Sequence, residues 1–257
     1  MDDFVGTARV LIAVGFALML VMLRLDAERF GTAEYYEATR DGERPSVLTR
    51  LAWYLLGVGL AVGIMLIHPS PQIDFFLGTG DRAQSVAWGL GYGLIGTAQA
   101  AIYAFLRYHR IRFPEVRSYP GGLLNATVTA FIDEVAFRGA LFGLLLIALP
   151  DNPTLANIIQ AILYTLTTRL GAPGRDRYLF VLTMGIGLVG GYLTALTGGI
   201  AAAFLGHAIT RFAVFLCTGH TGQPLPRGRE VEEIEARRRP PRGWRIVGSR
   251  DPAPPDR

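Results

Sequence analysis

Long apolar stretches recur along most of the chain. An apolar helix needs about 20 residues to cross the hydrocarbon core of a bilayer, and the pattern predicts seven such spans. They cover residues 4–23, 51–67, 86–106, 122–148, 155–168, 178–196 and 200–217. Helices are favoured over strands, because in lipid each backbone amide must be paired within its own segment. The sequence therefore predicts an all-α polytopic helix bundle over residues 1–217, in a multi-pass protein of the cell membrane.

The composition agrees with this interpretation. The 257 residues are 51% hydrophobic and only 18% charged, whereas about a quarter of the residues of a soluble domain are charged. Cys217 is the single cysteine, which excludes a disulfide scaffold and a cysteine-based metal site. The chain opens with Met1-Asp2-Asp3 and has no positive segment before the first span. We therefore expect that span to persist as a helix rather than to act as a cleavable signal peptide.

The arginines predict the orientation of the bundle. All 25 basic residues are arginine, and alternate connecting segments hold 21 of them against one in the other set. The positive-inside rule places the rich set in the cytoplasm, so that the N-terminus lies outside and the C-terminus inside. Seven spans satisfy that parity. Because the arginines are divided among several segments instead of forming one patch, no nucleic-acid partner is predicted, and membrane lipid is the expected surrounding partner.

Residues 218–257 differ from the rest of the chain. This segment is rich in proline, arginine and glutamate, and it holds nine of the arginines. Such a composition cannot bury enough apolar surface to offset the entropy of folding. We interpret it as a disordered cytoplasmic tail.

Ionisable residues interrupt the fourth span. Asp133, Glu134 and Arg138 lie well inside it, where each charge costs about 2.5–3.5 kcal/mol on the insertion scale. Glu134 and Arg138 are four residues apart and share a helical face, so they can pair. Asp133 is rotated by about 100° from Glu134 and needs a partner on another helix.

The seventh span supplies candidate partners. His207 and Arg211 again share a face at a spacing of four residues. Asp133 lies roughly 17 Å from the cytoplasmic end of its span and His207 roughly 15 Å from the cytoplasmic end of its own, at 1.5 Å per residue. We therefore expect the fourth and seventh spans to face each other and to enclose a polar cavity.

The chemistry of these residues leaves three interpretations open. Arg211 and one of the two acids can form an ion pair that locks the bundle. An acid beside His207 can activate a water molecule as a general base. Asp133, Glu134 and His207 can also serve as ligands of a divalent metal ion. The sequence assigns no organic cofactor.

The run from Asp133 to Gly139, followed by an apolar stretch, resembles the first motif of the CPBP intramembrane proteases, Glu-Glu-x-x-x-Arg. This family includes CAAX-processing enzymes and bacteriocin-processing or immunity proteins. Its second motif, Phe-x-x-x-His, falls on Tyr164 to Thr168. The third, His-x-x-x-Asn, falls on His207 to Arg211, after a Thr-Gly-Gly turn that is also typical of the family. The resemblance covers a core of about residues 120–217.

The resemblance implies roles for these positions. In the family, the first glutamate and the second-motif histidine are thought to activate water, and the third-motif histidine and asparagine to stabilise the oxyanion. By this correspondence Asp133 is the base, and His207 and Arg211 are the oxyanion donors. Glu134 and Arg138 match as the accompanying pair. Thr168 stands where the family has the water-activating histidine, and Arg211 where it has asparagine.

These departures leave two functions open. Threonine cannot take up a proton near neutral pH as histidine does, and Arg211 is attracted to the neighbouring acids. One hypothesis is an intramembrane endopeptidase that cleaves a membrane-bound or lipidated peptide. The other is a non-catalytic relative that binds or shields such a peptide, as an immunity or scaffold protein does. A small transporter is disfavoured, since no internal repeat relates the two halves of the chain.

Overall fold

The computed structural model describes residues 2–25, 47–108, 111, 113–114, 116, 119–167 and 177–218. Its helices are α1 (Asp2–Leu25), α2 (Val47–Ile67), α3 (Pro71–Asp74), α4 (Arg82–Tyr108), α5 (Tyr119–Asp133), the π-helix η3 (Glu134–Leu141), α6 (Phe142–Ala148), α7 (Pro153–Thr167), α8 (Arg177–Thr197) and α9 (Ala201–Thr218). No strand occurs among these residues. The predicted all-α class is confirmed.

The long helical segments coincide with the predicted spans. The helices α5, η3 and α6 follow one another without a break, and they form one rod over residues 119–148. Five helices in the described part of the chain are long and apolar enough to cross a membrane, namely α1, α2, α4, α8 and α9. A helical membrane bundle is therefore the architecture of this protein. The count of seven crossings and the orientation stay predictions.

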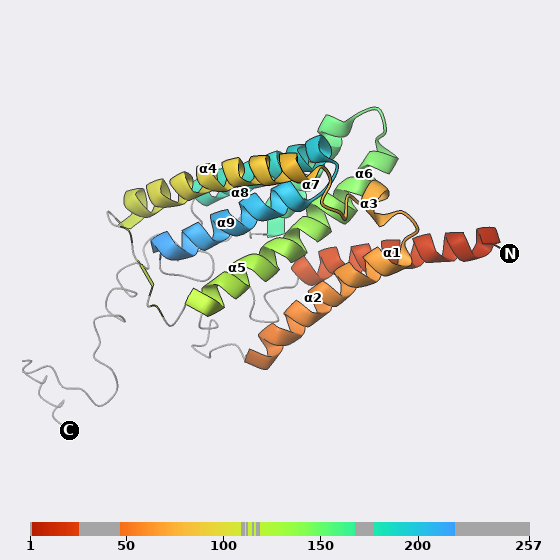
Figure 1. Cartoon of the computed structure of the whole chain (residues 1–257), viewed down its shortest axis with the longest axis horizontal. Coiled ribbons are helices and arrows are strands. Elements are labelled where there is room, and N and C mark those ends of the chain that lie inside the picture. The colour runs from red at the N-terminus through yellow and green to blue at the C-terminus, as the bar shows by residue number, and fades with distance from the viewer. Residues whose placement is uncertain are drawn as a thin grey trace, which may run out of the picture.

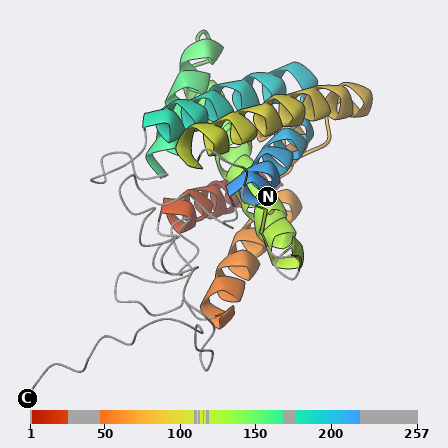
Figure 2. The same cartoon turned by 90° about the vertical axis from the view of Figure 1, so that its left-hand side faces the viewer.

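The rod over residues 119–148 lies at the centre of the bundle. The η3 segment contacts α1 on one side and α7, α8 and α9 on the other. The helices α4 and α9 pack along much of their length, α7 packs on α8, and α1 contacts α2 (Figures 1 and 2). The start of α1 and the end of α9 lie at opposite ends of the bundle (Figure 1). Side chains of η3 are consequently shielded on every side by other helices.

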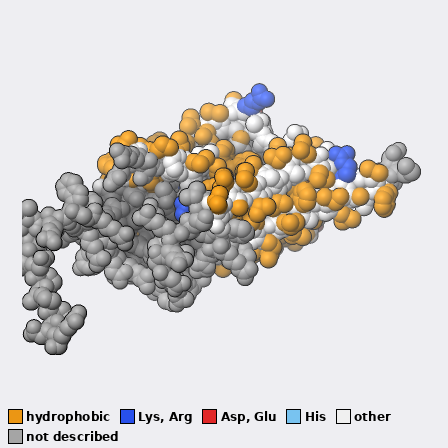
Figure 3. All heavy atoms as spheres, turned by 90° about the horizontal axis from the view of Figure 1, so that it is seen from below, with side chains coloured by type: hydrophobic (Ala, Val, Ile, Leu, Met, Phe, Trp, Pro, Cys, Tyr) orange, Lys and Arg blue, Asp and Glu red, His pale blue; other side chains and the backbone are white. Residues whose placement is uncertain are grey.

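The outer faces of the helices are apolar. Large hydrophobic side chains are exposed along α1, α2 and α4, among them Leu11, Met22, Leu55, Leu66 and Leu94. Figure 3 shows one such face, on which hydrophobic side chains predominate and charged ones are few among the residues drawn in colour. A contiguous apolar surface of this extent is typical of helices that face lipid, in keeping with a multi-pass membrane protein.

A glycine turn fixes the start of α9. Gly198 has a φ of 72°, and Gly80 in the segment packed against it has a φ of 59°; both angles lie in the left-handed region that favours glycine. The amide of Asp81 donates to the carbonyl of Thr197 at 2.9 Å, and the amide of Ile200 donates to that of Phe76 at 3.0 Å. These bonds tie α9 to the segment before α4, and so they set the depth of His207 in the bundle.

The helices α4 and α9 approach each other very closely. A Cβ atom on Gly96 would lie 1.9 Å from Oγ1 of Thr210, and one on Gly206 would lie 2.0 Å from the ring of Tyr92. A larger side chain would not fit at either glycine, because the two helix backbones are in close contact. Small residues at such contacts are common in pairs of membrane helices. This contact presses the His207 face of α9 towards the central rod.

Predicted positions in two regions fall outside the described residues. These are Thr168, the second-motif position, and the tail beyond residue 218. Many residues of the arginine-rich connecting segments also fall outside the described residues. The disordered tail and the cytoplasmic location of these arginines therefore stay predictions.

Candidate functional site

The acidic pair stands at a junction between two kinds of helix. Asp133 is the last residue of α5, and Glu134 is the first residue of the π-helix η3. The amide of Phe142 reaches the carbonyl of Phe137, five residues earlier, as a π-helix requires. One-turn π segments are rare and often occur at functional sites. At this junction the two adjacent acids turn towards different neighbouring helices.

Asp133 is held by arginines from two other helices. Nε of Arg24, at the end of α1, donates to Oδ1 of Asp133. Nη1 of Arg211, on α9, lies 3.5 Å from Oδ2. Asp133 is fully buried and Arg24 nearly so, whereas the Arg211 side chain retains 16% of its exposed surface. Each carboxylate oxygen of Asp133 thus has its own guanidinium partner.

Glu134 forms a second, separate cluster. Its Oε1 lies 2.6 Å from Nδ1 of His207 and 3.2 Å from Nη1 of Arg138. The hydroxyl of Tyr164, on α7, lies 3.2 Å from Nε2 of the same imidazole. All four side chains are buried. The cluster therefore joins η3, α7 and α9 through one histidine ring.

The contacts of His207 suggest its tautomer. A glutamate carboxylate can only accept, so Nδ1 of His207 carries the proton that it donates to Glu134. Nε2 of the same ring shares a hydrogen bond with the Tyr164 hydroxyl. Both ring nitrogens are accordingly engaged within the protein.

Arg138 fills the space beside this cluster. Its guanidinium lies 4.0 Å from the centre of the Tyr164 ring, a cation–π contact. A Cβ atom on Gly190 of α8 would lie 3.0 Å from Nε of Arg138, so that glycine leaves room for the guanidinium. Within the described residues, the three guanidinium nitrogens of Arg138 and Oε2 of Glu134 make no hydrogen bond. Arg138 is thus stabilised by charge and ring contact rather than by directed bonds.

The comparisons with known proteins address the same region. The family model named Rce1-like, described as type II CAAX prenyl endopeptidase Rce1-like, matches residues 116–213. This match supports the resemblance of the segment to the CPBP family. No curated protein and no solved structure gives a significant match to the chain. The CPBP segment contains both acids, Arg138, His207 and Arg211, but not Arg24.

The structure locates most of the motif positions of the CPBP core. Glu134 and Arg138 of the first motif pair as predicted, and the third-motif residue His207 reaches the same depth from α9. The tyrosine that opens the second motif, Tyr164, bonds directly to His207. The prediction that the fourth and seventh spans face each other is confirmed by these contacts and by the packing of α5 and η3 on α9.

Other expectations for the CPBP core require correction. The acid beside His207 is Glu134 and not Asp133, the residue assigned as the base, whose partners are Arg24 and Arg211. The contact of Arg211 with one of the two acids is the ion pair that the sequence left open as one interpretation. The expected polar cavity at these acids was also wrong. Asp133, Glu134 and Arg138 have no accessible surface, so the space between the helices is filled by the side chains themselves.

Arg24 is a site residue that the sequence interpretation missed. The first predicted span ends at residue 23, so Arg24 was counted with the arginines of the connecting segment that follows it. The apolar residue Leu25 follows it, and α1 continues to Leu25. Because Asp26 and Glu28 come soon after this single leucine, the sequence carried no clear signal that Arg24 belongs to the helix.

The proposed metal ligands do not converge. Asp133 points towards Arg24 and Arg211, while Glu134 and His207 bond to each other. Among the described residues, no group of three or more His, Cys, Asp and Glu side chains could hold a metal ion. A cation placed beside Asp133 would also be repelled by two guanidinium groups. This donor set does not fit the divalent metal considered from the sequence.

Proposed function

We propose that this chain is a non-catalytic CPBP-family membrane protein that binds a membrane-associated peptide without cleaving it. The matched family is named for CAAX prenyl endopeptidases, so the ligand class proposed is a peptide held at the membrane by a lipid group. The observation that carries the proposal is the engagement of both Asp133 oxygens by Arg24 and Arg211.

A general base needs a free lone pair next to the water that it activates. Asp133 stands at the position of the family's base, but its oxygens face two permanently charged guanidinium groups. Asp133 also has no accessible surface, which leaves no place for a water molecule beside it. These contacts support a structural role for Asp133 in holding α1, α5 and α9 together.

Oxyanion stabilisation requires a donor directed at the reacting carbonyl. Nε2 of His207 is already engaged in a hydrogen bond with the Tyr164 hydroxyl. Arg211, at the asparagine position, is directed at Asp133. Thr168, at the position of the second histidine, cannot act as a base near neutral pH. The groups that the reaction requires are thus replaced or engaged elsewhere.

The test uses the full-length protein in lipid nanodiscs. A set of lipidated model peptides carrying a quenched fluorophore reports cleavage, and a photoreactive group on the same peptides reports binding. We expect photocapture of intact peptide and no cleavage above the protein-free control. Cleavage that disappears in the Glu134→Gln or His207→Ala protein would overturn the proposal.

A second candidate function is peptide hydrolysis with Glu134, rather than Asp133, as the base. One observation favours it: Glu134 bonds to His207 at 2.6 Å, while its Oε2 has no hydrogen-bond partner among the described residues. In this case the Glu134→Gln protein would lose cleavage completely. A folded Arg211→Asn protein would keep it, because the ion pair that Arg211 forms is with Asp133. The same assay therefore separates the two candidates.

A further inference from the structure

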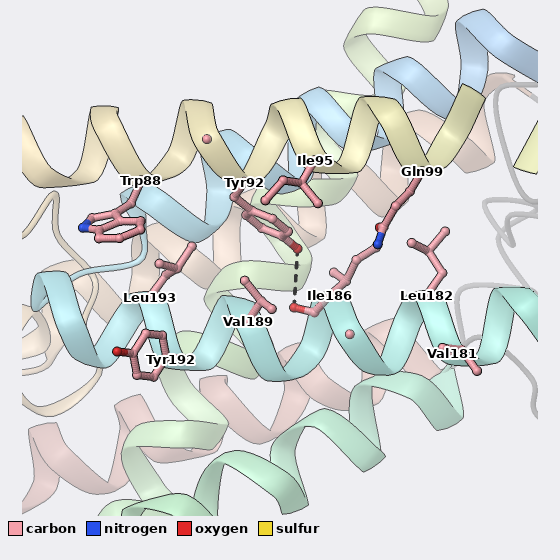
Figure 4. Close-up of a pocket in the computed structure, with 12 residues that line it drawn as sticks. Trp88, Tyr92, Ile95, Gln99, Val181, Leu182, Ile186, Val189, Tyr192 and Leu193 are labelled. Atoms are coloured by element: carbon pink, nitrogen blue, oxygen red, sulfur yellow. Dashed lines mark hydrogen bonds between the residues drawn. The ribbon is translucent and has the colours of Figure 1, made fainter. Parts of the chain in front are cut away.

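A pocket lies between α4 and α8, apart from the charged clusters. It has a volume of about 390 Å³ and is lined almost entirely by apolar and aromatic side chains. Figure 4 shows the two antiparallel helices with these side chains between them. Both helices are apolar enough to cross a membrane. The pocket is thus a groove along the membrane-embedded part of the bundle.

The groove has a buried floor and an exposed rim. Tyr92, Leu182 and Ile186 form the floor and are at least nine-tenths buried, while Trp88 and Tyr192 on the rim are 52% and 62% exposed. The rim residues belong to the lipid-facing surface of the molecule. A molecule that enters the groove therefore comes from the bilayer and not from the aqueous phase.

The length of the groove indicates which kind of molecule it can bind. Its α4 lining runs from Trp88 to Gln99, which is roughly 17 Å at 1.5 Å per residue. One leaflet makes up half of a hydrocarbon core that is about 30 Å thick, so the groove has the length of one chain in one leaflet. Trp88 and Tyr192 stand at the same end of it (Figure 4), where an aromatic belt marks the membrane interface.

The absence of charged side chains from the lining further limits the kind of molecule that the groove can bind. No Asp, Glu, Lys or Arg is among its residues, so the groove offers no side chain of opposite charge to a charged group. We infer that this groove is a binding site for one acyl chain of a bilayer phospholipid, whose headgroup stays at the Trp88 and Tyr192 end. The inference is independent of the function proposed above, since it requires neither peptide binding nor hydrolysis.

The floor of the groove connects it with the charged clusters. The Tyr92 hydroxyl donates to the carbonyl of Ile186 at 3.5 Å, which bridges α4 and α8 beneath the groove (Figure 4). The Tyr92 ring packs against Gly206, the residue before His207.

Two glycines make the inference testable. Gly91 on α4 and Gly185 on α8 line the groove, and a Cβ atom on either would meet nothing within 4 Å. A leucine at either place would have room for its Cβ atom and would extend into the groove, and leucine favours a helix more than glycine does. Gly59 on α2 also has nothing within 4 Å and lies outside the groove, so Gly59→Leu is the matched control.

The experiment uses the full-length protein in nanodiscs of phosphatidylcholine, a fraction of which carries a diazirine within one acyl chain. After illumination, mass spectrometry locates the labelled residues. We expect labelling at the groove residues Ile95 and Val189 to exceed that at the exposed α2 residues Leu55 and Leu66. Gly91→Leu and Gly185→Leu should each remove most of the groove labelling and leave the α2 labelling unchanged, while Gly59→Leu should leave groove labelling intact.

Two results would overturn the inference. Equal labelling of the groove and of α2 would mean that lipid only surrounds the protein without a specific site. Groove labelling that persists in both folded leucine variants would place the label elsewhere than in the groove. Melting temperatures of the three variants in the same nanodiscs establish that each is folded before it is labelled.

Discussion

Arg24 of α1 and Asp133 of α5 form a buried ion pair, although 109 positions separate them in the sequence. Arg211 of α9 approaches the same carboxylate from the other side, 3.5 Å from Oδ2. Three helices are consequently joined at one acid. Because a buried charge is costly without a partner, the cluster couples the folding of α1 to that of the CPBP core.

The two arginines should differ in their effect on stability. Removing one partner of a buried pair costs about 3–5 kcal/mol, so Arg24→Met should lower the free energy of unfolding by about that amount. Arg211 is partly exposed and makes the longer contact, so Arg211→Met should cost about 1 kcal/mol or less. Denaturant unfolding of both variants in the same detergent measures the difference. A larger loss for Arg211→Met would contradict the assignment.

An apolar replacement of the whole cluster provides a control for that prediction. Buried ion clusters can often be replaced by hydrophobic residues of similar volume at little cost. The triple variant Arg24→Met, Asp133→Leu, Arg211→Met should therefore be more stable than Arg24→Met alone. A triple variant less stable than the single one would mean that packing at these positions, rather than charge pairing, governs the effect.

Tyr164 should show two separable contributions. Tyr164→Phe removes only the hydroxyl that bonds to His207 at 3.2 Å, which should cost about 1 kcal/mol. Tyr164→Ala also removes the ring that supports Arg138 at 4.0 Å and packs against Phe137, and it should cost about 3–5 kcal/mol. Thermal unfolding of the two variants gives the ranking, and equal losses would be inconsistent with the ring contacts.

Glu134 and Arg138 should be energetically coupled. They form an ion pair at 3.2 Å in a region without accessible surface, and contacting residues of this kind show interaction energies of about 0.5–3 kcal/mol. A double-mutant cycle with Glu134→Leu and Arg138→Met measures that energy from four unfolding curves. A cycle that closes to zero would show that Glu134 is stabilised by His207 alone.

Glycine substitutions test the close packing of α4 on α9. Gly96→Ala would place a Cβ atom 1.9 Å from Thr210, and overpacking of this kind typically costs about 1–3 kcal/mol. Gly59→Ala meets nothing within 4 Å and should raise stability by up to about 1 kcal/mol through helix propensity. Melting temperatures should therefore move in opposite directions, and a neutral Gly96→Ala would show that the two helices can separate.

Much of the fold could be predicted from the sequence, because a helix that crosses the bilayer must be apolar over about 20 residues. The predicted spans agree with the helices to within a few residues, as in 51–67 against Val47–Ile67 and 178–196 against Arg177–Thr197. The observed helices are mostly longer at their ends. Polar residues in the first and last turns lie outside the apolar stretches from which the spans were predicted, although their backbone is still helical.

The site was harder to predict because it depends on direction as well as depth. The Glu134–Arg138 pair follows from local spacing on one helix. Which acid faces His207 depends on how the rod over residues 119–148 is rotated about its axis against α9, and the spacing of residues along one helix does not determine that rotation. Arg24 was hidden by the rule that assigns arginines near span ends to connecting segments, although here its side chain bonds inward to Asp133.

The position of Arg24 bears on how this protein can be divided. The stretch of residues 116–213 carries the family match, but the main cation for its buried acid comes from α1. A fragment reduced to that stretch would bury a carboxylate with Arg211 as its remaining counterion. The N-terminal helix is thus an integral component of the charged centre, and any truncated or chimaeric version must supply a replacement for it.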